Sequence, residues 1–513
     1  MTASNENLYA LFENRFPADR SWPFIEIPGG RTWSYGDLET ESGRIANRLR
    51  SLGVSPGDRV AVQVEKSPEA LFLYLACLRI GAIYLPLNTA YKAGEIGYFL
   101  GDAEPRVFVC DPAHAAEAQG LAQKAGVAHV ETLGGDGKGS LTEGAVGESA
   151  DCETAQAATD DIAAILYTSG TTGRSKGAML SHGNLASNAL VLHESWGFEP
   201  SDVLLHALPI YHTHGLFVAT NTVLLNGSAM IFLARFDPNQ VIELLPRATV
   251  FMGVPTLYVR LLEQTGFGAE TCRSMRLFVA GSAPLLPQTF EEFKARTGHT
   301  VLERYGMTEA GMITSNPLRG ERVAGKVGPP LPGVEARVAG EDGTVLGAGE
   351  VGILEIKGPN VFKGYWRMPE KTAEEFRPDG FFVTGDMAVI DEAGYVAIVG
   401  RSKDLVISGG FNVYPKEVEL AIDALPGVLE SAVIGLPHKD FGEGVTAVVV
   451  GEAGAAPDET GIIAAIKDEL AIFKVPKRVF FVDELPRNAM GKVQKNALRE
   501  RYAGTYDSPT RES

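Results

Sequence analysis

Residues 168–177, with the sequence TSGTTGRSKG, combine residue types that bind phosphate. The stretch holds five hydroxyl residues, three glycines, one arginine and one lysine. Glycines let backbone N–H groups approach a phosphate closely, hydroxyl groups add donors, and the two cations balance its charge. An apolar run at residues 162–167 precedes the stretch and predicts a buried strand. We therefore expect a phosphate-binding loop, with a glycine- and serine-rich surface turn as the alternative.

The stretch differs from the phosphate loop of P-loop ATPases and GTPases. That motif, GxxxxGK[ST], places a glycine before the lysine and a magnesium-binding hydroxyl after it. Here Ser175 precedes Lys176 and Gly177 follows it. The magnesium ligand of a P-loop protein is therefore missing, which argues against a nucleotide switch of that class.

Four further polar clusters follow expected strands or turns. Tyr305 begins the sequence YGMTE, in which the ring can stack on a base while Thr308 and Glu309 hold phosphate and a divalent metal. Asp386 follows the apolar residues 381–383, and a carboxylate at the end of a buried strand can accept hydrogen bonds from ribose. Taken singly, each cluster is also compatible with an ordinary turn, a strand end or solvated surface charge. The remaining clusters are GRSKD at residues 400–404, with SGGFN at 408–412, and PRNAMGK at 486–492.

Length and composition indicate a globular protein of more than one domain. With 513 residues the chain exceeds a single compact core, so two or three domains are expected. The net charge of −18 argues against a nucleic-acid-binding surface. Neither a signal peptide nor an apolar run of about 18 residues, the length of a membrane helix, is evident. We expect a cytoplasmic protein without nucleic-acid or membrane partners, and its oligomeric state stays open. The scattered cysteines indicate neither a zinc site nor a disulfide framework: Cys77, Cys110, Cys152 and Cys272.

The order of expected elements predicts an α/β protein. Ser67 and Pro68 have the types of a helix N-cap and first helical residue, and an apolar helix should follow to Leu78. Strands are expected on both sides of this helix, which indicates βαβ units and largely parallel sheets. From Asp404 onward, short strands alternate with helices, as in a small α+β domain. The other expected strands lie at residues 59–64, 83–87, 250–254 and 277–280.

Together and in this order, the five clusters resemble the acyl-adenylate-forming (AMP-binding) superfamily. This group includes acyl-CoA synthetases, aryl-CoA ligases, luciferases and peptide-synthetase adenylation domains, and the resemblance extends from about residue 8 to residue 502. It implies a large N-terminal domain, residues 1–402, of layered and mostly parallel sheets with helices and a small β-barrel-like part. It also implies a small, mobile α+β C-terminal domain, residues 403–513, with the hinge near Lys403. ATP, coenzyme A and a carboxylic acid would be the substrates, and magnesium would accompany ATP.

The resemblance also implies roles for individual residues. Lys492 would reach the α-phosphate during adenylation, Thr308 would contact the same phosphate, and Glu309 would hold magnesium. Tyr305 would stack on adenine, while Asp386 and Arg401 would hold the ribose. His212 is assigned to the catalytic group. The ATP and coenzyme A contacts would further include Thr168, Ser169, Gly170, Thr171, Thr172, Gly173, Lys176, Ser282, Ala283, Pro284, Glu303, Arg304, Gly306, Met307, Lys403, Gly409 and Gly410.

The acid is expected to be small and polar. A deep apolar pocket would suit long-chain or aromatic acids, whereas His212, Thr213 and His214 favour a polar substrate. Arg260 could pair with a second carboxylate, although a solvated surface arginine is the alternative. The pocket segments are similar to those of malonyl-CoA synthetases, which implies that Arg260 recognises the distal carboxylate. In that resemblance Ser282, His214, Thr213 and Met307 line the same pocket.

The expected activity is that of a malonate–CoA ligase, with methylmalonate as a plausible second substrate. One extra methyl group changes binding by only about 1–3 kcal/mol. A short- or medium-chain monocarboxylate–CoA ligase of the same superfamily is the enzymatic alternative. A nucleotide-binding module without catalysis is the alternative from another class, and it predicts no substrate-dependent exchange of pyrophosphate into ATP.

Overall fold

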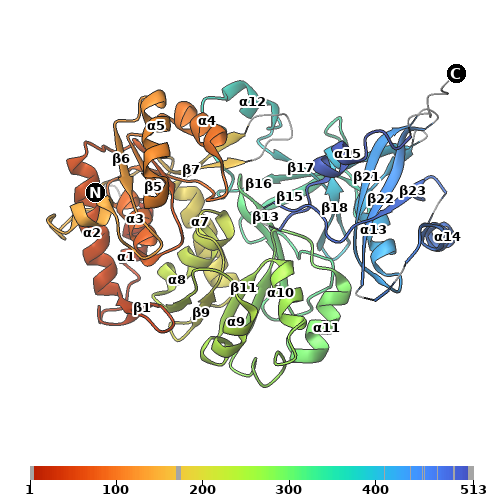
Figure 1. Ribbon diagram of the computed structural model, residues 1–513, viewed down its shortest axis with the longest axis horizontal. Coiled ribbons are helices and arrows are strands. Elements are labelled where there is room, and N and C mark those ends of the chain that lie inside the picture. The colour runs from red at the N-terminus through yellow and green to blue at the C-terminus, as the bar shows by residue number, and fades with distance from the viewer. Residues whose placement is uncertain are drawn as a thin grey trace.

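The computed structural model of the chain has a large N-terminal part and a smaller C-terminal part that lies against one side of it (Figure 1). The structure describes residues 5–168, 175–408, 411–438, 441–452, 454–455, 457–470, 472–488 and 491–506. Among these residues, no helix is both long and apolar enough to cross a membrane.

The first sheet positions the expected phosphate-binding stretch. Its strand order is β6-β5-β3-β4-β7-β8, with parallel pairing throughout except between β7 and β8. Thr168 at the end of β7 pairs with Lys176 at the start of β8, so the stretch connects two antiparallel strands. The strands are β3 (Arg59–Gln63), β4 (Ile83–Pro86), β5 (Val107–Cys110), β6 (His129–Thr132), β7 (Ile162–Thr168) and β8 (Lys176–Ser181).

The second sheet brings several candidate segments to one edge. Its order is β14-β13-β12-β11-β9-β10-β1-β2, and all neighbours from β13 to β1 are parallel. The carboxyl ends of parallel strands meet at one edge of a sheet, where ligands of α/β proteins bind. Residues 207–215, 254–260 and 281–284 follow β9, β11 and β12 at this edge. The strands are β1 (Pro23–Glu26), β2 (Thr32–Ser34), β9 (Val203–His206), β10 (Ala229–Phe232), β11 (Val250–Gly253), β12 (Leu277–Ala280), β13 (Leu302–Met307) and β14 (Gly311–Ser315).

Helices cover both sheets and complete the predicted α/β layers (Figure 1). The expected helix after the first strand is α3 (Pro68–Arg79): the Ser67 hydroxyl accepts a hydrogen bond from the Ala70 N–H, and Pro68 is the first helical residue. This confirms the capping prediction. The other helices of the N-terminal part are α1 (Leu8–Glu13), α2 (Tyr35–Ser51), α4 (Ala93–Ala103), α5 (Ala115–Ala125), α6 (Ser140–Ala145), α7 (His182–Ser195), α8 (Asn221–Asn226), α9 (Pro238–Leu244), α10 (Pro255–Leu262), α11 (Pro287–Thr297) and α12 (Pro369–Glu374); the short helical turns are η1 (Pro112–His114), η2 (His214–Thr220) and η3 (Leu245–Arg247).

A four-stranded antiparallel sheet forms the part that was expected to be barrel-like. It corrects one prediction: Asp386 does not end a buried strand, because it lies inside β17 and pairs with Arg401 of β18. The polar sequence TGD has the types of a strand end, but Gly385 adopts a φ of +72° and the hairpin ladder continues past it. The strands are β15 (Glu335–Ala339), β16 (Gly352–Lys357), β17 (Phe382–Ile390) and β18 (Val396–Arg401).

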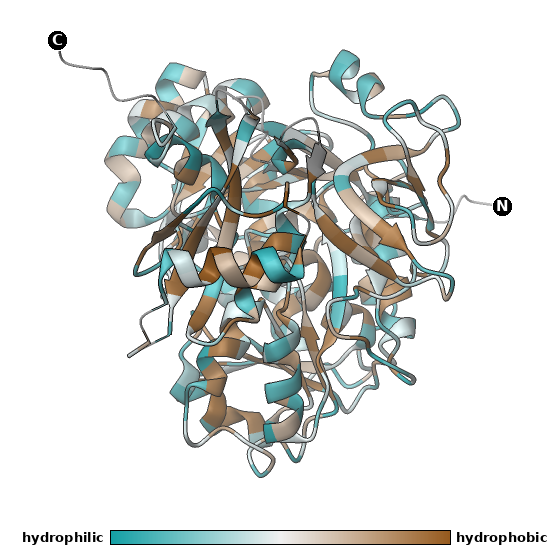
Figure 2. Ribbon diagram, turned by 90° about the vertical axis from the view of Figure 1, so that its right-hand side faces the viewer, coloured by the Kyte–Doolittle hydropathy of each residue, from teal (hydrophilic) through white to brown (hydrophobic). Residues whose placement is uncertain are grey.

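The C-terminal part is α+β, as predicted, and has its own core. Val418, Ile422 and Val433 pack with residues of the sheet β20-β19-β22-β21, and β23 pairs with β22. Figure 2, in which this part faces the viewer, shows brown, hydrophobic residues along its strands. The buried core of the N-terminal part ends at Val396, and the buried core of the C-terminal part begins at Val406. The domain boundary between residues 402 and 403 stays a prediction. The elements are η4 (Ser402–Asp404), β19 (Val406–Ser408), β20 (Phe411–Val413), α13 (Pro415–Asp423), β21 (Val428–His438), β22 (Gly442–Gly451), α14 (Glu459–Glu469), β23 (Arg478–Phe481) and α15 (Lys495–Arg501).

Asn184 provides a test of how the N-terminal layers are held together. Its buried amide donates hydrogen bonds of 2.8 Å each to Pro359 O and Val361 O, so Asn184→Ala should leave two buried carbonyl groups without donors. We expect the free energy of unfolding to fall by about 2 kcal/mol or more, measured by urea denaturation with tryptophan fluorescence. Asn47→Ala is the control, because the exposed Asn47 amide donates to Ser149 O and Asp151 O in the same way. Equal losses in the two variants would contradict the prediction.

Candidate active site

Lys176, the lysine of the expected phosphate-binding stretch, is held by residues nearly 200 positions away. Its Nζ lies 2.9 Å from Glu375 Oε1 and 4.0 Å from the centre of the Tyr365 ring. Both contacts fix the position of the ammonium group beside the C-terminal end of α12. Thr168 accompanies Lys176 in the β7–β8 pair, whereas Ser169, Gly170, Thr171, Thr172 and Gly173 lie outside the described residues.

Tyr365 links this lysine to the expected magnesium ligand. Its hydroxyl lies 3.1 Å from Glu309 Oε1 and 3.0 Å from Glu375 Oε2, so one hydrogen is shared between two carboxylates. Burial raises the pKa of Glu309, while Lys176 and the Tyr365 hydrogen bond oppose that rise. For Glu375 the opposite effect is larger. Burial raises its pKa, but the hydrogen bond and charge of Lys176 lower it below its ordinary value. The sequence analysis missed Tyr365 and Glu375, because no local pattern relates them to residue 176 or residue 309.

Asp386 is the centre of a second group. Arg401 Nε lies 2.7 Å from Asp386 Oδ1, and the Tyr305 hydroxyl donates to Asp386 Oδ2. The carboxylate therefore fixes both the Tyr305 ring and the guanidinium group, and it raises the pKa of Arg401. The structure thus brings three predicted nucleotide-binding residues together, and their roles toward adenine and ribose stay predictions.

Lys492 comes to the same place from the C-terminal part. Its residue is exposed overall, yet protein atoms surround the ammonium group closely. Desolvation and the neighbouring Arg401 lower the pKa of Lys492, and Asp386 and Glu309 oppose that effect. The half-buried His212 also belongs here: burial, Lys492 and Arg304 lower its pKa to about 3, so the imidazole is neutral at ordinary pH.

His214 and Ser282 form a third group at the edge of the second sheet. His214 opens the π-helical turn η2, a rare geometry that is frequent at functional sites. Its Nδ1 lies 3.4 Å from Ser282 Oγ, and its backbone N–H donates to His212 Nδ1 over 3.3 Å. Ser282 has a φ of +71°, a strained conformation for a serine. Thr213 is buried beside them but lines a small separate cavity next to Asn184.

The strand β13 separates two sides of the site. Successive side chains of a strand point to opposite faces, so Tyr305 faces Asp386 while Arg304 faces the group of His212 and His214. Glu303 shares the face of Tyr305 and accepts a hydrogen bond from the Gly325 N–H, and burial raises its pKa to about 8. The neighbouring predicted residues are partly exposed toward the site: Ala283, Gly306, Met307 and Thr308, with Pro284 exposed.

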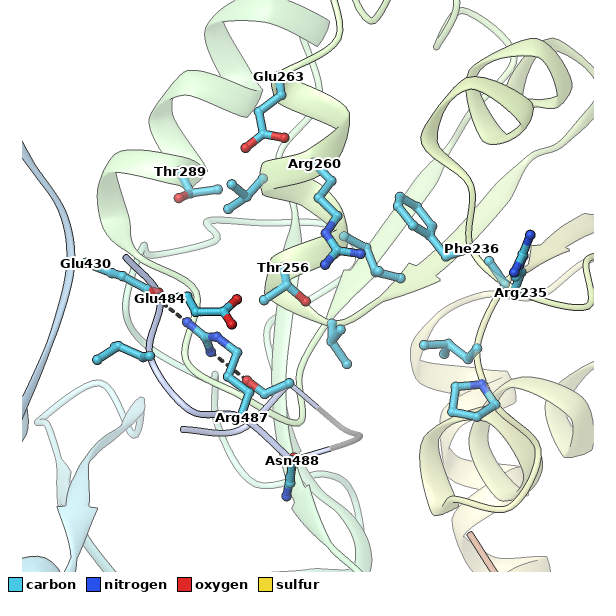
Figure 3. Close-up of a pocket in the computed structure, with 18 of the residues that line it drawn as sticks. Arg235, Phe236, Thr256, Arg260, Glu263, Thr289, Glu430, Glu484, Arg487 and Asn488 are labelled. Atoms are coloured by element: carbon cyan, nitrogen blue, oxygen red, sulfur yellow. Dashed lines mark hydrogen bonds and ion pairs between the residues drawn. The ribbon is translucent and has the colours of Figure 1, made fainter. Parts of the chain in front are cut away.

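Arg260 lies apart from these groups, in a cavity of about 1130 Å³ between the two parts of the chain. Figure 3 shows its guanidinium group pointing along α10 toward Thr256, with Arg487 and Glu430 of the C-terminal part on the far side. The Arg260 side chain is exposed and forms no ion pair with any described residue. Lys403 lies near Lys176, and burial lowers its pKa, as does that lysine. Gly409 and Gly410 lie outside the described residues.

The convergence of these groups on one region agrees with comparisons to known proteins. A family model of the AMP-binding enzyme matches residues 12–366, and one of the AMP-binding enzyme C-terminal domain matches residues 417–492. The chain belongs to the AMP-binding enzyme family. This confirms the resemblance that was inferred from the five clusters.

Relatives of this AMP-binding enzyme cover nearly its whole length. Feruloyl-CoA synthase from an Amycolatopsis species is 36% identical over 482 residues, which cover 92% of this chain and 95% of that protein. Malonate–CoA ligase from Arabidopsis thaliana is 34% identical over 555 residues, covering 97% and 90%. The crystal structure of ATP-bound MatB from Rhodopseudomonas palustris is 60% identical and covers 98% of this chain and 100% of that one, with a TM-score of 0.96.

The arrangement of the two parts resembles that of the nucleotide-bound relative. The structure of apo MatB, also 60% identical, superposes with a TM-score of 0.85, against 0.96 for the ATP-bound structure. Since the identity is the same, the difference reflects the spatial arrangement of the chain. The position of Lys492 beside Arg401 and Glu309 therefore belongs to an arrangement similar to the ATP-bound one.

Tyr365→Phe tests the bridge between the phosphate-binding lysine and the expected magnesium ligand. The variant removes the hydroxyl that serves Glu309 and Glu375, and a hydrogen bond to a charged group contributes about 1.5–3 kcal/mol. We expect kcat/KM for ATP to fall about tenfold or more in a pyrophosphate-release assay. Tyr395→Phe is the matched control, because its hydroxyl donates to Glu321 O at the exposed surface. Unchanged ATP kinetics in Tyr365→Phe would exclude a functional bridge.

Proposed function

We propose that this AMP-binding enzyme is a malonate–CoA ligase. It would couple malonate, ATP and coenzyme A to malonyl-CoA, AMP and pyrophosphate through an acyl-AMP intermediate. The observation that carries the proposal is the polar acid side of the cleft, where His212, His214 and Ser282 meet at the carboxyl ends of β9 and β12. An aromatic or long-chain acid would leave the buried His214 Nε2, which has no hydrogen-bond partner among the described residues, unsatisfied.

Among the relatives with 34–36% identity, sequence identity alone does not select the acid. Malonate–CoA ligases from Arabidopsis thaliana and Homo sapiens are each 34% identical to this chain, and feruloyl-CoA synthase is 36% identical. The polar lining favours malonate over ferulate, and Arg260 in the adjoining cavity adds a cation that could face a second carboxylate.

In this proposal the adenylation step depends on charge neutralisation. The substrate carboxylate and the α-phosphate are both anionic, so their approach needs cations and donors placed in advance. Lys492 would contact the α-phosphate together with Thr308, Lys176 would contact the outer phosphates, and Asp386 with Arg401 would hold the ribose. His212, which is neutral, would line the acid-binding side of the site without adding charge.

Glu309 fits a magnesium ion that accompanies ATP. Its carboxylate is buried, lies on the same side as Lys176 and Lys492, and offers the hard oxygen donors that magnesium prefers. Magnesium that accompanies a nucleotide is usually held by one or two carboxylates together with the phosphates. When bound, magnesium would offset negative charge on the phosphates.

The second half-reaction requires the C-terminal part to move. We propose residues 1–402 and 403–513 as the two domains, with the hinge at Lys403. Rotation about this hinge would withdraw Lys492 and bring Ser408, Gly409 and Gly410 toward the thiol of coenzyme A. The separate hydrophobic cores on the two sides of residues 397–405 support this division.

A screen of carboxylic acids tests the proposed activity. We expect pyrophosphate release with the highest kcat/KM for malonate, followed by methylmalonate, and far lower values for acetate, propionate, succinate and ferulate. Arg260→Ala should lower the ratio of the malonate value to the propionate value about 100-fold, because a charged hydrogen-bonded pair is lost. Arg235→Ala is the control, since Arg235 is exposed in the same cavity (Figure 3). Preference of the unmodified enzyme for ferulate or propionate would overturn the proposal.

Lys492→Ala tests the division of labour between the two half-reactions. We expect malonyl-AMP formation to fall by at least 100-fold, because the cation near the α-phosphate is removed. Thioester formation from supplied malonyl-AMP and coenzyme A should change less than tenfold. Rapid-quench measurement of each half-reaction provides both rates, and equal losses would contradict the assigned role.

A further inference from the structure

Lys492 lies at the end of a tight turn whose backbone is hydrogen-bonded on both sides of the lysine. The Asn488 N–H donates to Lys492 O over 2.9 Å, and Asn488 Oδ1 accepts from the Lys492 N–H over 3.0 Å. The Gly491 N–H donates to Asn488 O over 2.9 Å, and Gly491 has a φ of +74°, which a glycine adopts without strain. The turn therefore holds both peptide groups that flank Lys492.

Arg487 joins this turn to the sheet of the C-terminal part. Its Nη1 donates to Gly491 O over 2.6 Å, and its Nη2 donates to Glu430 Oε2 of β21. Dashed lines on the Arg487 guanidinium group mark these interactions in Figure 3. Gly491 O belongs to the peptide group that precedes Lys492. Because the guanidinium group is planar and rigid, one side chain fixes this peptide group relative to β21.

The same turn packs against the N-terminal part. A Cβ at Gly491 would lie 3.4 Å from Thr256 Oγ1, so the glycine lies directly beside the start of α10. Thr256, Arg487 and Asn488 all line the cavity between the two parts of the chain. The turn thus reaches across the boundary between the parts, and Lys492 follows it at the point where the C-terminal part approaches the site.

The ammonium group of Lys492 needs such support from its backbone. Desolvation and the charge of Arg401 both lower the pKa of Lys492, so both disfavour the charged lysine in this place. A lysine side chain is also flexible, and its compact charge lacks the rigid fork of an arginine. Since a catalytic charge acts only when it is placed in advance, a fixed backbone limits how far the ammonium group can move away.

We propose that Arg487 is a positioning residue for adenylation. Held by Glu430, it fixes the Gly491 carbonyl group and thereby the backbone of Lys492. This inference rests on the proposed function, in which Lys492 contacts the α-phosphate, and adds a residue that acts through the lysine. Arg487 and Glu430 both belong to the C-terminal part, so they would leave the site together with Lys492. Arg487 should therefore affect adenylation and not thioester formation.

Arg487→Met tests the inference through the two half-reactions. The variant keeps an unbranched side chain but removes both hydrogen bonds of the guanidinium group. We expect acyl-AMP formation to fall about 10- to 100-fold, because displacing a catalytic group by about 1 Å can cost about 100-fold. Thioester formation from supplied acyl-AMP and coenzyme A should be nearly unchanged, with both rates measured by rapid quench. Arg478→Met is the matched control: its Nε lies 3.0 Å from Glu459 Oε1, an ion pair between β23 and α14, and its loss should change neither rate.

A double-mutant cycle separates positioning from a general effect on the fold. If Arg487 acts through Lys492, Arg487→Met should lower adenylation little further in the Lys492→Ala background. The same loss in both backgrounds would overturn the inference, and so would equal losses of the two half-reactions in Arg487→Met. Glu430→Gln keeps the shape of its side chain but removes the charge that holds the guanidinium group. It should lower adenylation in the same selective way, and it provides the same test if Arg487→Met folds poorly.

The outcome can be distinguished from a failure of the proposed function. The assays use the acid that the unmodified enzyme activates fastest, so they do not depend on malonate being that acid. Preference for another acid would overturn the proposed substrate, while the cycle would still decide the role of Arg487. An unchanged adenylation rate in Lys492→Ala would overturn the proposed role of the lysine and this inference with it.

Discussion

The site depends on holding several cations close together in an acidic protein. Lys176, Arg401 and Lys492 approach one cleft from the first sheet, the antiparallel sheet and the C-terminal part. Desolvation lowers the pKa of Lys492, and repulsion from Arg401 adds to this effect. Asp386 and Glu375 offset part of this repulsion through direct ion pairs. The carboxylates thus fix the cations in position, and the remaining positive charge is available to a triphosphate.

The strand β13 divides this cleft into two chemically different sides. Tyr305 joins the ion-paired group of Asp386 and Arg401, where a nucleotide can be held by groups that are already oriented. Arg304, one residue earlier, lies among neutral histidines and has no such partner in the described structure. Alternation of side chains along one strand therefore separates the proposed nucleotide side of the site from the proposed acid side.

Much of the fold could be predicted because its signals are local. Ser67 and Pro68 predict the start of α3. The parallel strands are predicted by short apolar runs that are bounded by polar residues. Asp386 shows the limit of such signals. The polar sequence TGD is typical of a strand end, but pairing with β18 extends the strand, and that pairing depends on residues 15 positions further along.

The sequence by itself determined which chemistry the chain can perform, because phosphate, ribose and metal contacts depend on residue types at short spacings. Lys176, Tyr305, Glu309, Arg401 and Lys492 were all identifiable as candidates for this reason. Only the tertiary structure decided how they meet: the link of Lys176 to Glu375, the bridge through Tyr365 and the unpartnered state of Arg304. These features join segments that lie far apart in the chain, and sheet order and the docking of the C-terminal part create them. No local pattern encodes such contacts, since their energy comes from neighbours that only folding supplies.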